Sequence, residues 1–205
     1  MSSPSSSKGL MVIISGPSGV GKTTITHHVE LALDGAFSVS MTTRPMSPGD
    51  VEGRDYYFVD RARFEQCRDE GELLEWAEVF GHLYGTPRRP VTASLAKGQL
   101  VLCEIDVEGA VQIKQNMPQA FAIFVDPPSE QALLHRLRER GRDPEEVIKK
   151  RFAKAKLEIE RSRACGVYDG FILNDRLEDA VTEGIELVRA QLNGRQSDVA
   201  PQGNR

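Results

Sequence analysis

The stretch from Gly16 to Thr23, Gly-Pro-Ser-Gly-Val-Gly-Lys-Thr, has the residue types and spacing of a loop that binds nucleotide phosphates. Its glycines let successive backbone N–H groups surround phosphate oxygens, and the loop leads into a helix N-terminus, where anions are favoured. Lys22 would reach the β- and γ-phosphates, and the Thr23 hydroxyl would ligate Mg²⁺. The predicted nucleotide-binding residues are Gly16, Pro17, Ser18, Gly19, Val20, Gly21, Lys22, Thr23 and Thr24.

Two other interpretations of this phosphate loop (residues 16–23) fit less well. Chance would place the four fixed residues of the pattern in roughly one chain of this length in a hundred. Here an apolar run also precedes the loop and a helical stretch follows it. The order of Gly16, Gly19 and Gly21 does not match the Gly-x-Gly-x-x-Gly fingerprint of dinucleotide-binding folds. The loop therefore indicates nucleotide-phosphate binding, but it does not name the acceptor, because many activities share it.

A second group of polar and aromatic residues, between residues 37 and 89, could bind the acceptor. Arg44 with tyrosine hydroxyls could grip a phosphate monoester. The carboxylate of Glu75 could accept two neighbouring N–H groups, a pair that guanine offers and adenine does not. These residues could equally form a small aromatic core with Arg44 as a surface charge, and their spacing does not decide between the two. The group comprises Ser40, Arg44, Tyr56, Glu75, Tyr84 and Thr86.

Residues 135–156 carry nine Lys or Arg against four Asp or Glu, a local charge of 9 − 4 = +5 in a chain of net charge −4. Arg136 and Arg140 are four residues apart and share one helical face. Such a run is usually a solvated surface. Phosphoryl transfer, however, needs positive charge around the moving group, for which arginine is well suited. The segment is therefore a candidate lid, with Arg138 and the lysines expected on the surface.

The expected strands and helices alternate, which predicts an α/β fold with a parallel sheet covered on both faces. Ser129 is a good N-cap for one of the helices. The segment 37–89 differs, because its pattern predicts short, mostly antiparallel strands and one helix near 62–70. The strands are expected at 10–14, 100–105, 121–125 and 171–173, and the helices at about 22–33, 108–116, 130–140, 144–163 and 177–192.

The composition is typical of one ordinary globular domain, with 205 residues of which 40% are hydrophobic and 27% charged. The net charge of −4 gives no general reason to bind nucleic acid or anionic lipid. The sequence has no run of about 18 apolar residues and no apolar signal segment at its start. Three widely spaced cysteines disfavour a disulfide framework and favour a reducing compartment. We therefore expect a cytoplasmic protein without nucleic-acid or membrane partners, and the sequence favours no particular oligomeric state.

Over nearly its whole length, from about residue 10 to 192, the chain resembles the guanylate kinases, which phosphorylate GMP from ATP. The stretches that carry the resemblance are ISGPSGVGKT (14–23), SVSMTTRP (38–45), GRDYYF (53–58), LEWAE (74–78), YGT (84–86), IDVEGA (105–110) and RLRERGRD (136–143). The resemblance implies a three-layer core with a phosphate loop (10–36, 90–126 and 164–192), an inserted mixed α/β GMP-binding lobe (37–89) and a helical lid (127–163). The polar ends, 1–9 and 193–205, are expected to be disordered tails.

The resemblance also implies roles for single residues. Arg44, Tyr56 and Tyr84 would hold the GMP phosphate, and Ser40, Glu75, Thr86 and Asp106 would bind guanine. Asn174 would lie near the adenine of ATP. Mg²⁺ would be the cofactor, bound by Thr23 with Glu104 or Asp106 in its outer shell. The residues expected to supply catalytic positive charge are Lys22, Arg44, Arg136, Arg140 and Arg151.

The chain departs from the family pattern at two positions. Ser47 stands where the family usually has a second phosphate-gripping arginine, which weakens the clamp unless Arg54 or a water fills the gap. Glu104 stands where the family usually has Asp. Glu104 and Asp106 are two apart on a strand and share a face, so both acids are aimed at the site. The sequence leaves open whether Glu104 belongs to the metal shell or is a structural partner.

The expected reaction is direct in-line transfer of the γ-phosphoryl group of ATP to GMP, giving ADP and GDP, as part of purine nucleotide metabolism. No general base is needed, because the acceptor is an anionic oxygen. One alternative is a kinase of the same fold that acts on a sugar phosphate, which Ser40, Glu75 and Thr86 disfavour. Another is a non-catalytic guanylate-kinase-like interaction module, which the presence of Lys22 and Thr23 disfavours.

Overall fold

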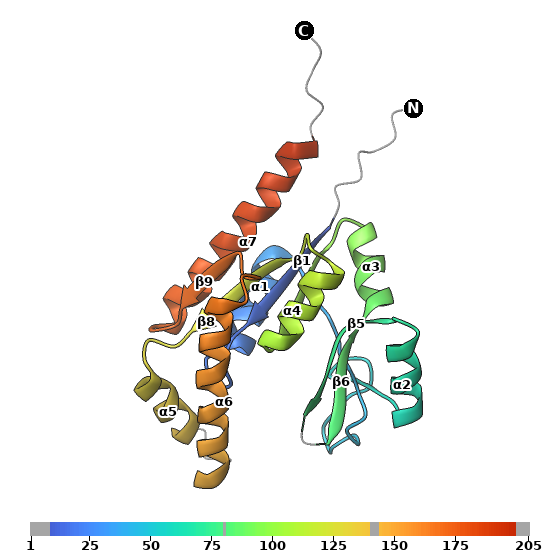
Figure 1. The fold of residues 1–205 in the computed structure, drawn as a ribbon. Coiled ribbons are helices and arrows are strands. Elements are labelled where there is room, and N and C mark those ends of the chain that lie inside the picture. Colours follow the sequence, from blue (N-terminus) through green and yellow to red (C-terminus); the bar gives the residue numbers. More distant parts are fainter. Residues whose placement is uncertain (1–8, 80, 140–143, 200–205) are drawn as a thin grey trace, which may run out of the picture.

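A five-stranded parallel sheet in the order β2-β7-β1-β8-β9 forms the core (Figure 1). The structure is a computed structural model, and it describes residues 9–79, 81–139 and 144–199. The core elements are β1 (Leu10–Ser15), α1 (Lys22–Leu33), β2 (Ala36–Phe37), α3 (Arg88–Ala96), β7 (Leu100–Ile105), α4 (Val107–Asn116), β8 (Phe121–Asp126), β9 (Gly170–Leu173) and α7 (Leu177–Val199).

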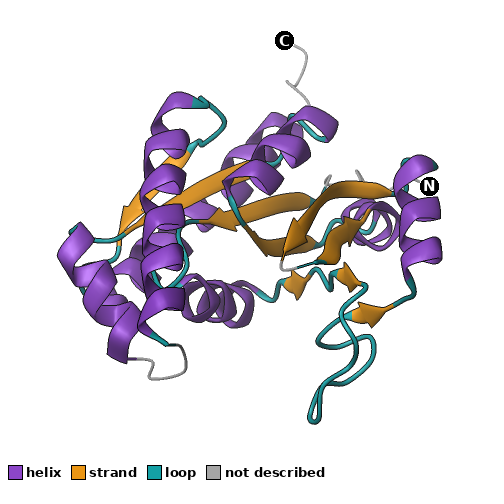
Figure 2. Cartoon of the chain, turned by 60° about the horizontal axis from the view of Figure 1, so that its bottom comes forward, coloured by secondary structure: helices purple, strands orange, loops and turns teal. Residues whose placement is uncertain are grey.

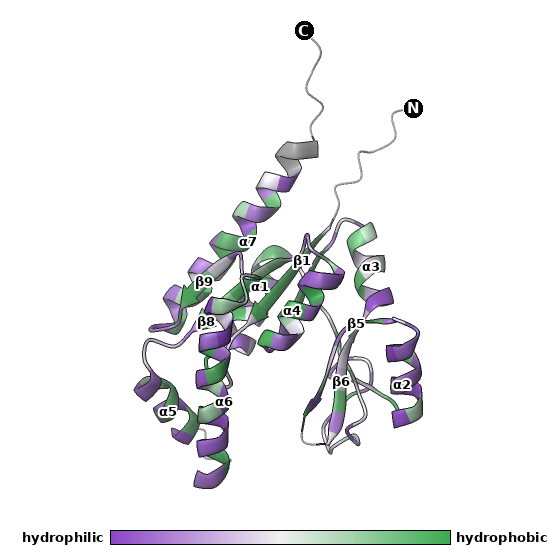
Figure 3. Ribbon diagram, in the orientation of Figure 1, coloured by the Kyte–Doolittle hydropathy of each residue, from purple (hydrophilic) through white to green (hydrophobic). Residues whose placement is uncertain are grey.

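The central strand β1 is buried on both faces, and successive residues belong to opposite hydrophobic clusters. Leu10, Val12 and Ile14 pack among residues of α1, α5 (Glu130–Glu139), α6 (Glu145–Ala164) and α7. Met11 and Ile13 pack with residues of α3 and α4. Figure 2 shows helices on both sides of the core strands, and Figure 3 shows that these strands are apolar. Burial on both faces explains why this strand is a continuous apolar run without polar alternation.

The inserted lobe is built on a second sheet, in the order β4-β3-β6-β5. Strand β3 pairs with β6 in antiparallel and with β4 in parallel orientation, and β5 and β6 form an antiparallel pair. A small core of Phe64, Cys67, Leu73 and Leu83 joins the sheet to α2. The lobe and the pair of helices α5 and α6, which belong to the segment expected to act as a lid, stand on either side of the core (Figure 1). The lobe elements are β3 (Met41–Thr42), β4 (Tyr57–Phe58), α2 (Arg61–Asp69), β5 (Leu73–Val79) and β6 (His82–Pro87).

The elements expected from the sequence are present, and Ser129 caps α5 as predicted, accepting a hydrogen bond from the amide of Ala132 at 3.1 Å. Helix α3 was not predicted; it contains Pro90, which a helix tolerates in its first turn.

The prediction of a disordered tail from residue 193 is wrong as far as Val199, because α7 continues to that residue. Arg195 on this extension donates hydrogen bonds to the carbonyls of Gly9 and Gln119, which fixes the helix to the core.

Within the described ranges, no helix combines the length and the apolar character that crossing a bilayer requires. Among the same residues, no three His, Cys, Asp or Glu side chains gather into a cluster that could hold a metal ion by themselves. All three cysteines are free thiols, and Cys67 and Cys103 are buried.

Candidate active site

The carboxyl ends of four parallel strands meet at one edge of the core sheet, where open α/β sheets bind their ligands. The phosphate loop follows β1. Glu104 lies near the end of β7, and Asp106 follows that strand as the N-cap of α4. Asn174 follows β9, and its amide donates to the carbonyl of Asp126 at the end of β8 at 2.8 Å. The sheet therefore brings together four segments that are far apart in the sequence.

The phosphate loop has the backbone conformation that its glycines permit. Gly21, directly before α1, has a φ of 98°, and a Cβ on it would lie 2.5 Å from the side-chain nitrogen of Asn174. A larger residue would therefore be both strained and obstructed. The ammonium of Lys22 donates to the carbonyls of Gly16 at 2.7 Å and Pro17 at 3.1 Å. The loop thus holds its lysine against its own backbone, at the position expected to receive triphosphate oxygens.

Asn174 lies 3% exposed beside the phosphate loop and donates from Nδ2 to the carbonyl of Val20 at 2.7 Å. Its Oδ1 is the buried side-chain polar atom that lacks a hydrogen-bond partner in the described part of the chain. Arg136, from α5, donates to the carbonyls of Asn174 at 2.9 Å and Asp175 at 3.1 Å. These residues line a cavity of about 360 Å³, the β9-side cavity, together with Gly19, Gly21, Thr24 and Leu177.

In the lobe, Arg44 lies against Tyr56, with its guanidinium 5.3 Å from the ring centroid, and the rings of Tyr56 and Tyr84 meet edge to face at 5.8 Å. Asp50 accepts a hydrogen bond from Arg44 at 2.9 Å, and the Ser47 hydroxyl accepts another at 2.6 Å. The hydrogen bond to Asp50 is the main cause that raises the pKa of Arg44 above its usual value. The three residues expected to hold the GMP phosphate are therefore adjacent, and Ser47 orients the arginine instead of adding a second one.

The guanine pocket expected from the resemblance is centred on Glu75, which is 7% exposed and accepts a hydrogen bond from Thr86 Oγ1 at 2.6 Å. Burial raises the pKa of Glu75 to about 7; the negative charge of Asp106 also raises it, while the hydrogen bonds from Thr86 oppose the shift. Ser40 is half-buried directly before β3. The carboxylate thus lies where a base with two adjacent N–H donors would relieve an unfavourable burial.

Hydrogen bonds between β5 and α4 fix this pocket relative to the core. The amide of Trp76 donates to Gln112 Oε1 at 3.1 Å, and Gln112 Nε2 donates to the carbonyl of Trp76 at 3.0 Å. Asn116 Nδ2 donates to the carbonyl of Leu74 at 2.8 Å. Because Gln112 and Asn116 lie on the helix that Asp106 caps, the strand bearing Glu75 is held at a fixed distance from Asp106.

A cavity of about 470 Å³, which we call the transfer cavity, connects the phosphate loop with the lobe. It brings together Lys22, Tyr56, Tyr84, Glu104 and Asp106, all expected from the sequence to act in one site. The other residues that line it are Gly16, Ser18, Val79, Ile105, Lys154 and Glu158.

Some expected residues lie apart from the transfer cavity. Arg136 lines the β9-side cavity instead, and Arg151 lines neither of the two. Arg140 lies outside the described residues. Arg54 forms an ion pair with its neighbour Asp55 at 2.8 Å and is largely exposed, so in this structure it does not take the place of an arginine at position 47.

Lys154 and Glu158 were not predicted as residues of this site. Lys154 is exposed, as expected for the lysines of this segment, but the sequence did not predict that it would also line the transfer cavity. It forms an ion pair with Asp106 at 3.2 Å. Burial raises the pKa of Glu158, and Asp106 raises it further, whereas Lys154 and Lys22 lower it. The signal in the sequence was the spacing of Arg151, Lys154 and Glu158, which places the three on one face of α6.

The oxygen atoms around Thr23 fit a hard divalent cation. Thr23 Oγ1 donates to Glu104 Oε1 at 3.1 Å, so a hydroxyl and a carboxylate lie side by side at the start of α1. Mg²⁺ prefers oxygen ligands and keeps several waters, one or two protein groups and substrate phosphates around it. This donor set needs no dedicated cluster of acids, and the carboxylate of Glu104 lies beside the Thr23 hydroxyl.

Comparisons with known proteins agree with one another. A family model described as "Guanylate kinase" matches residues 8–191. Guanylate kinase of Carboxydothermus hydrogenoformans is 47% identical over 177 residues, which cover 86% of this chain and 85% of that protein. A guanylate kinase of Thermus thermophilus is 46% identical over 184 residues, covering 90% of this chain and 82% of that protein.

Solved structures give the same answer at the level of the fold. A crystal structure of guanylate kinase from Anaplasma phagocytophilum superposes with a TM-score of 0.68 at 34% identity, covering 91% of this chain and 87% of that one. A gluconokinase structure from Sinorhizobium meliloti 1021, at 15% identity and a TM-score of 0.51, shares the fold alone. With a family model over most of its length and relatives near 46% identity, the chain belongs to the guanylate kinase family.

Proposed function

We propose that this protein transfers the γ-phosphoryl group of ATP to GMP, giving ADP and GDP. The observation that supports this most directly is the transfer cavity of about 470 Å³, which Lys22 lines together with Tyr56 and Tyr84. A donor phosphate bound by the loop and an acceptor phosphate bound by the tyrosines would meet in this space. Catalysis of phosphoryl transfer consists almost entirely of placing the two reactants in line and stabilising the charge between them.

ATP binds through the backbone amides of the phosphate loop, with Lys22 on the β- and γ-phosphates. The β9-side cavity accommodates the adenosine end, where the unpartnered Oδ1 of Asn174 accepts a hydrogen bond from the exocyclic amino group of adenine. When bound, Mg²⁺ on Thr23, with Glu104 or Asp106 in its outer shell, neutralises charge on the phosphate oxygens.

GMP binds in the lobe, with its phosphate against Arg44, Tyr56 and Tyr84. Glu75 accepts the two N–H groups on the guanine edge, a pair that adenine cannot offer, and Asp106 accepts a further donor. The hydroxyls of Thr86 and Ser40 complete the pocket on the same base. Because Glu75 is buried, a base that leaves it unpaired is strongly disfavoured, which gives the pocket its selectivity.

The lid contributes positive charge and excludes water. When α5 and α6 close over the site, they bring the guanidinium groups of this segment to the phosphates. These residues are Arg136, Arg140 and Arg151. Planar guanidinium groups suit the oxygens of a moving phosphoryl group. Closure also removes the water that would otherwise accept it. The GMP phosphate is already an anionic nucleophile, so no side chain has to act as a general base.

The decisive experiment is a panel of monophosphate acceptors incubated with ATP and Mg²⁺, with ADP release as the readout. GMP is expected to be phosphorylated far more efficiently than AMP or a sugar phosphate. A preference for the sugar phosphate would identify a different acceptor on the same fold, and an absence of turnover with every acceptor would favour a non-catalytic module. Product identification by mass is needed as well, because ADP release without GDP would indicate hydrolysis of ATP.

A further inference from the structure

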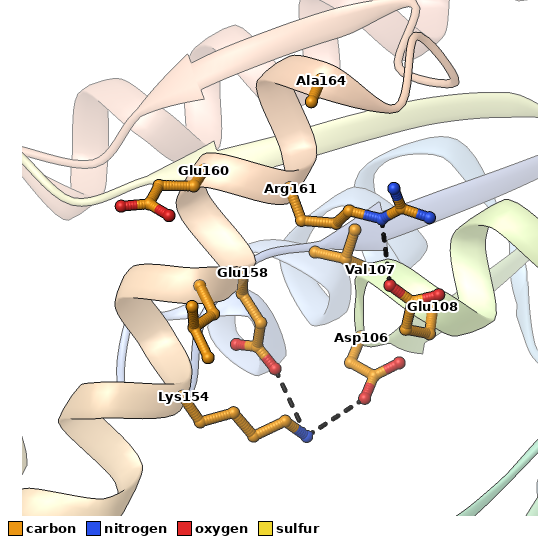
Figure 4. A pocket seen from close by; sticks show the side chains of 9 residues that line it. Asp106, Val107, Glu108, Lys154, Glu158, Glu160, Arg161 and Ala164 are labelled. Carbon is orange, nitrogen blue, oxygen red and sulfur yellow. Dashed lines mark hydrogen bonds and ion pairs between the residues drawn. The ribbon is translucent and has the colours of Figure 1, made fainter.

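Lys154 reaches from the lid helix α6 into the transfer cavity, where it is held between two carboxylates. Its ammonium lies 3.2 Å from Asp106 Oδ2 and 3.4 Å from Glu158 Oε1. Figure 4 shows it extending between these residues, one from the core and one from its own helix. Asp106 and Glu158 together outweigh the effect of burial and raise the pKa of Lys154 above its usual value, so it is charged at neutral pH.

We propose that Lys154 is a further cation of the phosphoryl-transfer site, which is held by Asp106 and Glu158 until GMP binds and is then released to the phosphate groups, where it stabilises the charge of the moving phosphoryl group. This inference rests on the proposed function, since it assumes that guanine binds at Asp106 and that two phosphates meet in the transfer cavity.

The charges that line the transfer cavity show why such a cation is needed. Among its lining residues in the described part of the chain, Lys22 and Lys154 are the cations, and three carboxylates oppose them. Arg44, at the acceptor phosphate, is paired with Asp50. Without Lys154, the lining of this cavity in the described part of the chain would offer one lysine against three carboxylates, before the lid arginines and Mg²⁺ are counted. Charge of this kind is what catalysis of phosphoryl transfer requires. The three carboxylates are Glu104, Asp106 and Glu158.

The geometry at Asp106 links the release of Lys154 to guanine. Oδ1 of Asp106 already accepts a hydrogen bond from the amide of Gly109 at 3.1 Å, as the N-cap of α4. Oδ2 is the oxygen that Lys154 contacts. An N–H donor of guanine that binds Asp106 at Oδ2 shares this oxygen with the lysine and thereby weakens the ion pair. Lys154 is 59% exposed, and exposed ion pairs contribute about 1 kcal/mol or less. Displacing the lysine from Asp106 therefore costs guanine little binding free energy.

The four-carbon side chain of lysine allows this movement without movement of the helix backbone. Its ammonium is a compact charge on a flexible stem, which can turn from one acceptor to another. The site between Asp106 and Glu158 and the phosphate loop are both parts of the transfer cavity lining, so the path lies within one space. Lys154 thus joins recognition of the base to the supply of positive charge for the reaction.

Two other ion pairs of α6 serve as comparisons. Lys156, two residues further on, pairs with Glu130 of α5 at 2.8 Å, and Arg161 pairs with Glu108 of α4 at 3.1 Å. Each joins α6 to a neighbouring helix, and neither lines the transfer cavity. Loss of either removes an interhelical ion pair without removing a charge from the site. Lys156→Gln is therefore a matched control for Lys154→Gln.

The first test is steady-state kinetics of Lys154→Gln, Lys154→Arg and Lys156→Gln with ATP, Mg²⁺ and GMP. We expect Lys154→Gln to lower kcat by at least about tenfold, with both KM values within about threefold of those of the unsubstituted protein. Lys154→Arg should retain most of kcat, and Lys156→Gln should match the unsubstituted protein. A kcat within twofold for Lys154→Gln, or an equal loss in Lys156→Gln, would overturn the proposal. So would a higher KM for GMP at unchanged kcat, because Lys154 would then only hold Asp106.

The second test needs no turnover. Reductive methylation with ¹³C-formaldehyde places a probe on each lysine, and the Lys154 signal is the one missing from the spectrum of Lys154→Arg. GMP alone should shift this signal, AMP at the same concentration should leave it unchanged, and the Lys156 signal should respond to neither. A Lys154 signal that GMP leaves unchanged would overturn the release step. If GMP shifts the signal but the enzyme does not phosphorylate GMP, the proposed function fails while the release of Lys154 by GMP stands.

Discussion

Glu75 and Thr86 face each other across the β5–β6 pair, with Thr86 Oγ1 donating to Glu75 Oε1 at 2.6 Å. The other oxygen, Oε2, lies beside Gly109 of α4, where a Cβ would come within 3.2 Å of it. One oxygen of Glu75 is thus oriented by the hydroxyl, and the glycine keeps space beside the other. Burial holds the pKa of Glu75 at about 7, so its charge state changes within the physiological range.

The first prediction concerns the pH dependence of GMP binding. Only the ionised carboxylate of Glu75 can accept both N–H donors of guanine, and its pKa in the protein is about 7. The dissociation constant for GMP, measured by calorimetry, should therefore be about tenfold larger at pH 6 than at pH 8. Glu75→Gln is the control, because it removes this titration. The second ionisation of the GMP phosphate, near pH 6, remains in both proteins and contributes equally. Equal pH dependence in the two proteins would contradict the assignment.

Glu75→Gln should also lower the catalytic efficiency with GMP and raise the free energy of unfolding. The efficiency with GMP should fall by about 10²-fold, because the charged acceptor is lost. The folded pKa of Glu75 is raised from 4.5 to about 7, so ionisation destabilises the folded protein increasingly as the pH rises through this range. At pH 8 the substitution should raise the free energy of unfolding by up to about 3 kcal/mol, and at pH 5 the gain should fall to about 1 kcal/mol or less.

Urea denaturation at the two pH values measures this difference. Glu78→Gln, on the same strand but exposed, is the matched control and should change neither stability nor efficiency appreciably. A destabilised Glu75→Gln protein at pH 8 would mean that the carboxylate is stabilised in the free protein by contacts that outweigh its burial.

Lys22→Ala tests the phosphate loop. Lys22 donates to the carbonyls of Gly16 and Pro17, which places its charge over the loop. Its loss should lower kcat by about 100-fold or more while leaving the unfolding transition nearly unchanged, since Lys22 is not part of the hydrophobic core. Lys149→Ala removes an exposed lysine of the lid that pairs with Glu146, and this variant should retain normal turnover. Near-normal turnover of Lys22→Ala would contradict the role given to this side chain.

The phosphate loop could be predicted from the residues alone because its chemistry is local. Eight consecutive residues set the backbone conformation, the cation and the hydroxyl, and Gly21 in the structure has the positive φ that its position requires. The sheet core was equally predictable, since a continuous apolar run such as β1 has to be covered on both faces.

The acceptor pocket could be predicted only through the family resemblance, because its residues come from different elements. Counting outward from the turn near Gly81 along β5 and β6 does bring Glu75 opposite Thr86, so this one pair could have been derived from a hairpin register. Nothing in the residue types places Asp106 beside either of them. That arrangement depends on the hydrogen bonds by which Gln112 and Asn116 fix β5 to α4.

Lys154 could not be placed from the sequence for a similar reason. Its pair with Glu158 follows from helical spacing, but its pair with Asp106 spans 48 positions and depends on how α6 packs beside α4. The extension of α7 to Val199 was missed because its polar residues resemble a tail, and contacts of Arg195 with distant carbonyls hold it.

Ser47→Arg tests the departure from the family pattern in the phosphate clamp. In the structure Asp50 accepts hydrogen bonds from both Arg44 and the amide of Ser47, so the clamp offers the acceptor phosphate an arginine that is already neutralised. A second guanidinium in this loop would share Asp50 and leave a net positive charge facing the phosphate. The KM for GMP should therefore fall about three- to tenfold, with a smaller change in the KM for ATP.

Met46→Arg, at the exposed neighbouring position, adds the same charge outside the clamp and should leave the KM for GMP within twofold. Equal KM values in the two variants would mean that position 47 does not reach the phosphate, and that the clamp is complete with Arg44, Tyr56 and Tyr84.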